Sequence, residues 1–568
     1  MTFATMIECN TGMPTERLAR MACRRTRAVR TRASIRRLMT GLLGMSLVGL
    51  TACTSQPAPA DPAWVQSTPA LGTGPATSEV EARRVDRVQP KLTWDKCGTA
   101  ECGSVRLPLD YDEPDGTMIE LSLTRVKVKD RKNRIGTLFV NPGGPAVPAT
   151  GFALQAPDFF SKRVLARYDI VGIEPRGVGG RNVLRCFTSQ DGLSQAMQGS
   201  VSTFPYSASE ETAAVRTAKA VGRACSTTGK ELAGAMSTAE VARDMDVLRR
   251  ALGDEKLSFY GKSYGSFLGQ VYANMFPDRI RSVVIDGVID PRRWTGAAGS
   301  PDLDPGAAAE GAYRALTEIF TRCDKAGRVA CPIAGNAART FDELAQRLRT
   351  RSVTVDEPGY GRIAVGYDDL VANVLNSLYL PQGADDIVRT VQRYRAAART
   401  SPAAAEPNPP TAQAGSGPAS DYPGEGRYGV TCTDMDSRPT DAADFPALAA
   451  QADRKTPYFG RLWTWTYSVC ASATWTVQDE DAYRGPFDRR TSEPVLVVGN
   501  YWDPATNYSG AKAVAGLLPN SRLLTSDNWG HTAYRFSPCV KSAVDAYLIQ
   551  KALPADGTVC KENPQPFA

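Results

Sequence analysis

The chain has 568 residues, 42% of them hydrophobic and 22% charged, so it is long enough to bury at least one large core. Its net charge of +7 equals the charge of residues 1–52, which contain nine arginines and two glutamates. The rest of the chain therefore sums to zero. This distribution gives no reason to expect nucleic acid or an anionic surface as a partner.

The N-terminal segment 1–52 predicts a secretory signal that ends in a lipid attachment site. Its arginines precede an apolar run of 13 residues, Leu38 to Leu50, which is shorter than the ~20 residues of a membrane-spanning helix. The run ends in Leu50-Thr-Ala-Cys53, which resembles the bacterial lipobox, whose cysteine is lipidated. We therefore expect an extracellular or cell-envelope protein whose only membrane contact is a lipid on Cys53. Cleavage near Cys53 without lipidation, giving a free protein, is the alternative.

Ten cysteines follow Cys53, and an even number in an exported chain indicates disulfides. Cys-x-x-Cys spacing is absent from the sequence, which argues against a zinc ribbon, and we expect neither a metal nor a cofactor. Because short loops close most easily, we expect each cysteine to pair with its neighbour. The expected pairs are Cys97–Cys102, Cys186–Cys225, Cys323–Cys331, Cys432–Cys470 and Cys539–Cys560.

The segment after Cys53 begins with a tether and continues into alternating strands and helices. Residues 53–90 are rich in Pro, Ala, Thr and Ser and are expected to be disordered. Residues 91–291 then predict an α/β fold, in which a mostly parallel sheet is covered by helices on both faces. The expected strands are 119–126, 136–140, 168–173, 257–260 and 282–285, with helices at 238–252 and from 266.

The pattern changes after Pro291. Residues 292–490 predict a largely helical cap, with helices at 308–323, 337–349 and 385–399 and a mobile loop at 401–426. Strand patterns resume in residues 491–568, at 494–498 and 522–525. The chain is thus expected to form one α/β domain interrupted by a helical insertion.

A nucleophile motif lies between the strand at 257–260 and the helix that follows it. Gly261-Lys-Ser263-Tyr-Gly265 matches G-x-S-x-G, and this strand-turn-helix context is what the motif requires. The glycines allow a turn tight enough to expose the serine hydroxyl. We expect Ser263 to be a catalytic nucleophile.

The sequence offers one base for this serine, because His531 is its only histidine. It follows the last predicted strand, and the order Ser, Asp, His fits Asp503 as the acid that orients the imidazole. Asp527 is the rival acid, but it lies only four residues before His531. A single histidine also excludes the three-histidine zinc sites and the H-E-x-x-H metalloproteases.

An oxyanion hole needs two backbone N–H groups directed at the developing charge. The N–H of Tyr264, directly after the nucleophile, is expected to supply one. Asn141-Pro-Gly-Gly-Pro145 follows an early strand, and Gly144 is expected to supply the other, with Gly143 as the alternative.

With these residues placed, residues 94–562 resemble the secreted tripeptidyl aminopeptidases, α/β-hydrolase serine exopeptidases with a TAP-like C-terminal domain that are related to proline iminopeptidases. The resemblance implies a Ser–His–Asp acyl-enzyme mechanism and a helical cap before the acid and base. In one departure, Ala146-Val147 replaces the glycine-rich continuation usual in that family, which affects the expected shape of the acyl pocket. The matching motifs are Val105-Arg-Leu-Pro-Leu-Asp-Tyr111, Asn141–Pro145, Glu174-Pro-Arg-Gly-Val-Gly179, Gly261–Gly265 and Asp286-Gly-Val-Ile-Asp-Pro291.

The leading function is an aminopeptidase that releases short peptides, such as tripeptides, from the free N-termini of peptides or proteins. Such an enzyme needs a carboxylate for the substrate ammonium. Asp434 is the first candidate and Asp436 the second, because both lie next to Cys432, which is expected to anchor the segment. Solvated loop acids are the alternative interpretation of this pair. An esterase with the same triad, or a catalytically silent envelope-binding lipoprotein, is the competing function.

Overall fold

The computed structural model describes residues 64–66, 75–180, 182–200, 203–296, 303–304, 306–357, 361–400, 424–561 and 563–568. The predicted signal segment and Cys53 lie outside these ranges. Within them, no helix is both long enough and apolar enough to cross a bilayer.

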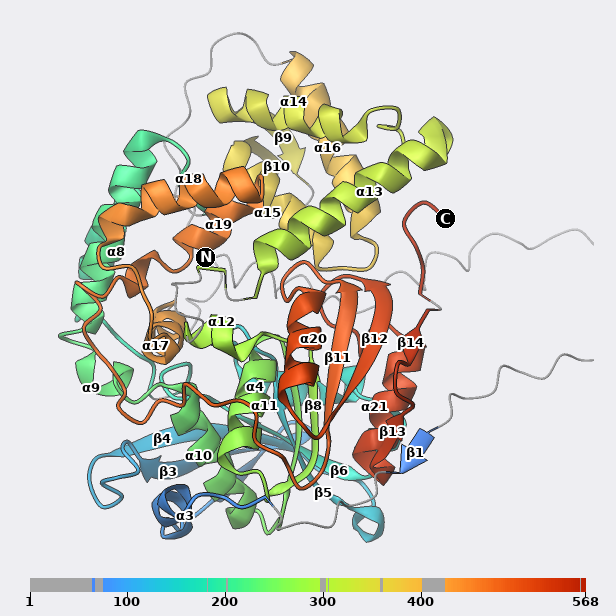
Figure 1. The fold of residues 1–568 in the computed structure, drawn as a ribbon. Helices are drawn as coiled ribbons and strands as arrows, with labels where there is room; N and C mark the ends of the chain where they lie inside the picture. Colours follow the sequence, from blue (N-terminus) through green and yellow to red (C-terminus); the bar gives the residue numbers. More distant parts are fainter. Residues whose placement is uncertain are drawn as a thin grey trace, which may run out of the picture.

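A ten-stranded mixed sheet forms the centre of the molecule, with the strand order β14-β12-β11-β8-β7-β5-β6-β4-β3-β2 (Figure 1). Neighbouring strands from β14 to β6 run parallel, and β4, β3 and β2 extend the sheet as antiparallel strands. The predicted α/β-hydrolase fold is confirmed. The strands are β2 (Thr93–Cys97), β3 (Ala100–Pro108), β4 (Met118–Val126), β5 (Gly136–Asn141), β6 (Tyr168–Ile173), β7 (Leu257–Lys262), β8 (Ile280–Asp286), β11 (Val495–Trp502), β12 (Ser521–Trp529) and β14 (Val559–Cys560).

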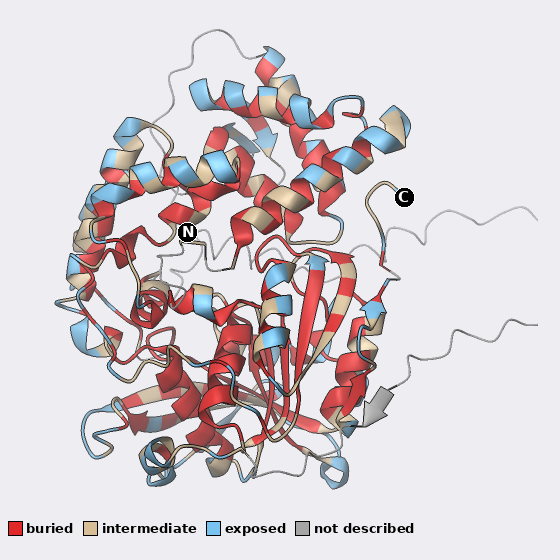
Figure 2. Cartoon of the chain, in the orientation of Figure 1, coloured by how far each residue is buried: buried red, intermediate tan, exposed pale blue. Residues whose placement is uncertain are grey.

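Both faces of the parallel part of the sheet are buried, as its continuous apolar runs require. Val283 and Ile285 of β8 belong to one core cluster, and Val284 between them belongs to the other. Helices α10 (Thr238–Ala251) and α11 (Tyr264–Met275) contribute to the first cluster and α21 (Pro538–Gln550) to the second. Figure 2 shows the central strands of the sheet and helices α10 and α11 mostly in the colour of buried residues.

The predicted cap lies over the end of the sheet where the parallel strands finish (Figure 1). Its expected helices are present as α13 (Ala308–Ala330), α14 (Ala337–Thr350) and α16 (Gly383–Thr400). Most of the predicted loop 401–426 lies outside the described residues, and its last two residues begin helix α17. The remaining helices of the cap are α15 (Tyr367–Leu378), α17 (Glu425–Asp434), α18 (Phe445–Lys455) and α19 (Phe459–Trp465).

Two features of the cap differ from the sequence-based expectation. A hairpin of β9 (Val353–Glu357) and β10 (Gly361–Val365) lies among the helices. Helix α8 (Ala208–Cys225), which precedes the expected insertion, lies beside α18 and α19 (Figure 1) and forms an ion pair with the cap through Glu211 and Arg461. The cap is therefore built from two segments of the chain.

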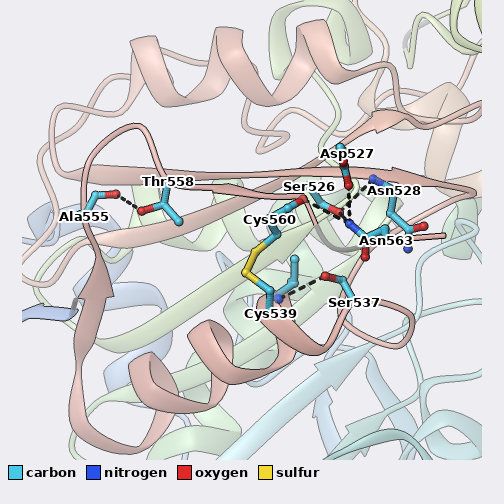
Figure 3. Close-up of a disulfide and its surroundings, with 10 residues drawn as sticks. Ser526, Asp527, Asn528, Ser537, Cys539, Ala555, Thr558, Cys560 and Asn563 are labelled. Carbon is cyan, nitrogen blue, oxygen red and sulfur yellow. Dashed lines mark hydrogen bonds between the residues drawn. A yellow bond between two sulfur atoms is a disulfide. The ribbon is translucent and has the colours of Figure 1, made fainter. Parts of the chain in front are cut away.

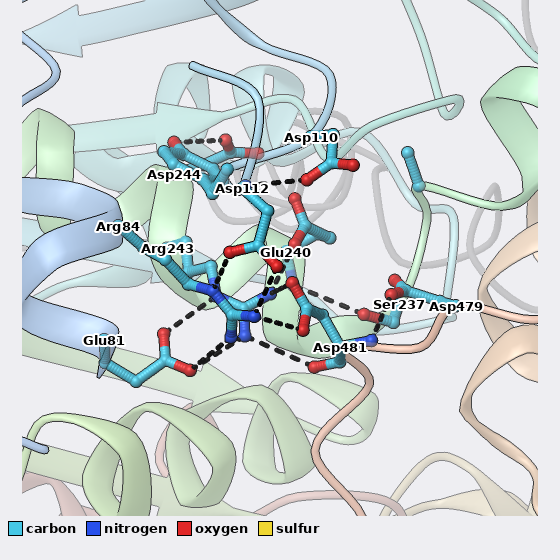
Figure 4. A network of polar contacts seen from close by, with 12 residues as sticks. Glu81, Arg84, Asp110, Asp112, Ser237, Glu240, Arg243, Asp244, Asp479 and Asp481 are labelled. Carbon is cyan, nitrogen blue, oxygen red and sulfur yellow. Dashed lines mark hydrogen bonds and ion pairs between the residues drawn. The ribbon is translucent and has the colours of Figure 1, made fainter.

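The end of the predicted disordered tether 53–90 is helical, as α3 (Glu79–Asp86). Ion pairs hold it to the core, with Arg243 Nε of α10 at 2.8 Å from Glu81 and Arg84 Nε at 2.6 Å from Asp112 (Figure 4). Arg84 also contacts Asp481, beyond the cap helices. Charged side chains therefore fix a segment whose composition alone suggested disorder.

Five disulfides join neighbouring cysteines, and every predicted pair is present. Cys186–Cys225 closes the segment that carries α8, and Cys432–Cys470 joins α17 to the turn after α19. Each of the two cap segments is thus closed by a disulfide of its own.

Candidate active site

Ser263 occupies a sharp turn between β7 and α11. Its backbone has φ 58° and ψ −126°, a left-handed conformation that is costly for a residue with a side chain. The flanking glycines make this turn possible, because a Cβ on Gly261 would lie 2.2 Å from the Gly265 carbonyl oxygen. A Cβ on Gly265 would lie 2.7 Å from the Asn141 carbonyl oxygen. The predicted nucleophile thus has the geometry that the G-x-S-x-G motif requires.

His531 and Asp503 lie together, on the loops that follow β12 and β11. The Nδ1 atom of His531 is 3.0 Å from each carboxylate oxygen of Asp503. Asp503 is fully buried and also accepts hydrogen bonds from the N–H groups of Ala505, Thr506 and Thr532. These donors fix the carboxylate, so it can hold the imidazole with Nε2 directed away from it.

The loop that carries His531 is held by both the core and the cap. The buried Asn500 side chain donates to the carbonyl oxygens of Gly530 and Thr532, at 2.9 and 3.1 Å. The His531 N–H donates to the carbonyl oxygen of Tyr379, a cap residue, at 3.0 Å. The Tyr379 ring also packs edge-on against the imidazole, with 5.1 Å between the ring centroids.

The rival acid Asp527 is not bonded to the histidine. Its carboxylate accepts a hydrogen bond from Asn563 Nδ2 at 2.6 Å, near the Cys539–Cys560 disulfide (Figure 3). Asp503 is therefore the acid that the structure places against His531.

The glycine loop after β5 packs directly against the nucleophile turn. A Cβ on Gly143 would lie 2.9 Å from the Tyr264 nitrogen and 2.8 Å from Ser263 Cβ, so only glycine fits. Gly143 was the alternative oxyanion donor, but its N–H donates to Asn141 Oδ1 at 2.9 Å, within the same loop. Gly144 lines the cavity beside Ser263, as the first choice for this role requires.

Ser263 and His531 open into one cavity whose roof belongs to the cap. Tyr379, Leu380, Arg427, Trp463 and Tyr467 line it from the cap side. The core side includes Phe152 and Phe159. Ala146 and Val147, the departure from the family pattern, are absent from the described lining. The cavity thus offers aromatic walls to a substrate held against Ser263.

The expected amine-binding residues Asp434 and Asp436 do not line this cavity. Asp434 is 4% exposed and accepts hydrogen bonds from the Thr238 N–H and hydroxyl and from Trp294 Nε1. Burial raises its pKa to about 6, although these donors act in the opposite direction. Asp436 is on the surface, with its side chain 71% exposed. The expectation that these two residues bind the substrate amine is therefore wrong. Asp434 joins α17 to the start of α10, and Asp436 faces solvent.

Asp304 is the carboxylate that the described cavity lining does contain, and the sequence-based reasoning missed it. Its two oxygens accept from the N–H groups of Ala308 and Ala309 at 2.7 and 2.8 Å. Gly306, two residues later, accepts a hydrogen bond from the Asn507 N–H, which brings this segment against the loop of Asp503. The sequence signal was only that of an acid at a helix start, which is common in helices without a ligand.

Known proteins resemble the chain over most of its length. A family model described as TAP-like protein matches residues 456–560, and one described as alpha/beta hydrolase fold matches residues 136–302. Tripeptidyl aminopeptidase of Streptomyces coelicolor is 28% identical over 88% of this chain and 90% of that protein. Serine protease Hip1 of Mycobacterium tuberculosis is 30% identical over 84% and 93%, and Carboxylesterase B of the same species is 29% identical over 83% and 90%.

The sheet, the strained serine and the paired histidine and aspartate define an enzyme, a serine hydrolase of the α/β-hydrolase class. Within that class, the chain belongs to the family that contains the tripeptidyl aminopeptidases and serine protease Hip1. The silent envelope-binding protein is thereby set aside as a function.

Proposed function

We propose that this enzyme is a serine aminopeptidase that releases short peptides, tripeptides in particular, from free N-termini. The observation that carries the proposal is the roofed cavity, in which Asp304 shares the described lining with Ser263 and His531. A roof limits how much peptide fits beyond the scissile bond. A carboxylate in that space gives a terminal ammonium a partner of opposite charge.

The triad supplies the chemistry by acyl transfer. Asp503 holds Nδ1 of His531, so Nε2 takes the proton of the Ser263 hydroxyl as its oxygen attacks the scissile carbonyl. The N–H groups of Tyr264 and Gly144 stabilise the oxyanion. His531 then gives the proton to the leaving amine. The shortened substrate departs with this new N-terminus, and the short N-terminal peptide stays bound to Ser263 as an ester. Water, activated by His531, hydrolyses this ester and frees the short N-terminal peptide.

Asp304 is suited to bind the substrate ammonium because its carboxylate is already oriented. The two backbone N–H groups at the start of α13 fix both oxygens of the carboxylate. The other charged residues of the described lining, apart from His531, are the cations Lys262, Arg427 and Arg535. They repel an ammonium from the remaining walls and direct it to Asp304.

The test compares free and N-acetylated tripeptide substrates with a small neutral ester. In the Asp304→Asn variant, kcat/KM for the free peptide should fall about ten-fold or more, since a charge-assisted hydrogen bond is lost. Ester turnover should stay unchanged. Asp436→Asn, which changes an exposed acid of the cap segment, is the matched control and should alter neither rate. Equal cleavage of free and acetylated peptides by the unmodified enzyme would contradict the aminopeptidase.

An esterase is the second candidate, favoured by the 29% identity to Carboxylesterase B. The same triad and oxyanion donors serve an ester, which needs no ammonium site. If esters are turned over well and free peptides are not, the second candidate replaces the first.

We further propose that the enzyme is exported and anchored by a lipid on Cys53. The five disulfides support this, because such bonds persist on the oxidising side of a membrane. Cys53→Ser should move the enzyme from the membrane fraction to the soluble fraction without changing its rate on a small ester. An unchanged distribution would contradict the lipid anchor.

A further inference from the structure

Asp286 lies at the end of β8, between the strands that carry the catalytic residues. In the sheet register it is paired with Lys262 of β7 on one side and with Val498 of β11 on the other. Lys262 directly precedes Ser263, and β11 leads into the loop of Asp503. The position of Asp286 therefore brings it next to two of the three catalytic segments.

The backbone at Asp286 bonds to both neighbouring segments. Its carbonyl oxygen accepts from the Ser263 N–H at 2.9 Å, and the Gly287 N–H donates to the Val498 carbonyl oxygen at 3.2 Å. Gly287 also lies against the base, because a Cβ there would be 3.1 Å from His531 Cε1. These contacts fix the nucleophile turn relative to the sheet.

The Asp286 side chain reaches the third catalytic segment, the loop of His531. Its oxygens accept from the Ala533 N–H at 2.9 and 3.1 Å and from the Tyr534 N–H at 2.9 Å. They also accept from the Tyr260 hydroxyl of β7 at 2.9 Å. None of the described contacts joins this carboxylate to the imidazole, which Asp503 holds instead. Asp286 is thus not the acid of the triad.

A buried carboxylate is a weak source of stability, because its desolvation offsets much of what its hydrogen bonds contribute. Asp286 is completely buried, and that burial, together with the nearby Asp503, raises the pKa of its carboxyl. What the group does provide is a fixed acceptor for two successive N–H groups just after His531. This is a constraint on geometry.

We infer that Asp286 is a positioning residue that sets the placement of His531 relative to Ser263, by bonding the nucleophile turn through its backbone and the histidine loop through its carboxylate. The inference rests on the triad and is independent of whether the substrate is a peptide or an ester. A misplacement of about 1 Å between such groups costs on the order of 100-fold in rate.

The test is Asp286→Asn, which keeps the size of the side chain but turns an NH₂ group toward a backbone N–H. Measured on a small neutral ester, kcat should fall about ten-fold or more while KM stays within about two-fold. The rate at which a fluorophosphonate labels Ser263 should fall by the same factor, because labelling also needs His531 correctly placed.

Asp545→Asn is the matched control. Asp545 is a buried acid of α21 that accepts from the Tyr534 hydroxyl at 2.8 Å, but it has no described contact with the backbone of the histidine loop or the nucleophile turn. This variant should keep kcat and the labelling rate within about two-fold of the unmodified enzyme. A merely structural role for Asp286 predicts that both variants behave alike.

If Asp286→Asn does not fold, Tyr260→Phe provides the test, since it removes one donor to Asp286 and leaves the loop untouched. It should lower kcat about two- to five-fold with KM unchanged. Rates equal to those of Asp545→Asn, in whichever Asp286-directed variant folds, would overturn the inference. An unmodified enzyme that fluorophosphonate does not label would overturn the triad itself, and this inference with it.

Discussion

In the proposed mechanism Ser263, His531 and Asp503 act on a single proton, so the effects of removing them should not be additive. Ser263→Ala, His531→Ala and Asp503→Asn should each lower kcat about 10³-fold or more on any substrate. The double variant Ser263→Ala/His531→Ala should be little worse than either single variant. Steady-state kinetics checks this, with circular dichroism as the control for folding. An active His531→Ala enzyme would contradict the mechanism, because the sequence contains no second histidine.

The two cap acids separate what a sequence can indicate from what it cannot. The residues of the proposed triad could be selected from the sequence because the nucleophile motif has a strict local context and the sequence has one imidazole. The carboxylate that lines the cavity could not, since Asp434, Asp436 and Asp304 are all aspartates in the sequence and differ only in where the fold places them. Asp434 was buried by the docking of α17 on α10, a contact between residues 196 apart.

Asp434 should make stability depend on pH. Its pKa is raised to about 6, above the unfolded value of about 3.9, so the folded state keeps a proton that the unfolded chain releases between these values. The contribution of Asp434 to stability therefore falls as pH rises from 4 to 6. Relative to the unmodified enzyme, Asp434→Asn should gain about 2 kcal/mol of unfolding free energy between pH 4 and pH 7.

Urea unfolding of both proteins at several pH values measures this difference. Asp436→Asn is the control two residues away, because it replaces an exposed carboxylate and removes no buried one. A flat difference for Asp434→Asn would contradict a buried, ionised carboxylate at the junction of cap and core.

At the scale of elements, long periodic or continuous apolar segments were predictable and short ones were not. The parallel strands β5, β6, β7, β8 and β11 and the helices α10, α13, α14 and α16 were expected near their observed bounds. The hairpin β9–β10 was missed because each strand has only 5 residues and β10 is mostly exposed. Helix α3 was missed because ion pairs with distant residues stabilise it, and such pairs leave no local pattern.

The disulfides should differ in what they contribute, in order of the loops they close. Cys432–Cys470 spans 38 residues and Cys97–Cys102 spans five. Chain entropy gives about 4 kcal/mol for the first and about 2 kcal/mol for the second. Serine replacement of both cysteines in each pair, followed by denaturant unfolding, should show this order. The reverse order would contradict the chain-entropy argument. Free thiols among the ten cysteines of the denatured, unreduced protein would contradict the pairing itself.

At the scale of the whole molecule, the sequence predicted a core interrupted by one insertion. In the structure the cap also contains α8, which comes before that insertion in the chain. Glu211 and Arg461 join the two segments, and the Ser226 hydroxyl donates to the Thr474 carbonyl oxygen at 2.9 Å. An amphipathic helix has the same periodicity whether its apolar side meets a sheet or other helices, so its pattern does not specify its layer.

The hydrogen bond from the His531 N–H to the Tyr379 carbonyl oxygen means that the catalytic base is shared between core and cap. Gly530 shows how close the two are, because a Cβ there would lie 2.8 Å from the same oxygen. An enzyme trimmed to its sheet would keep Ser263 and Asp503 but lose an acceptor that holds the base. Exchange of caps between relatives, as a route to new specificity, must therefore carry over a carbonyl at the position of Tyr379, or the graft will change the chemistry along with the substrate.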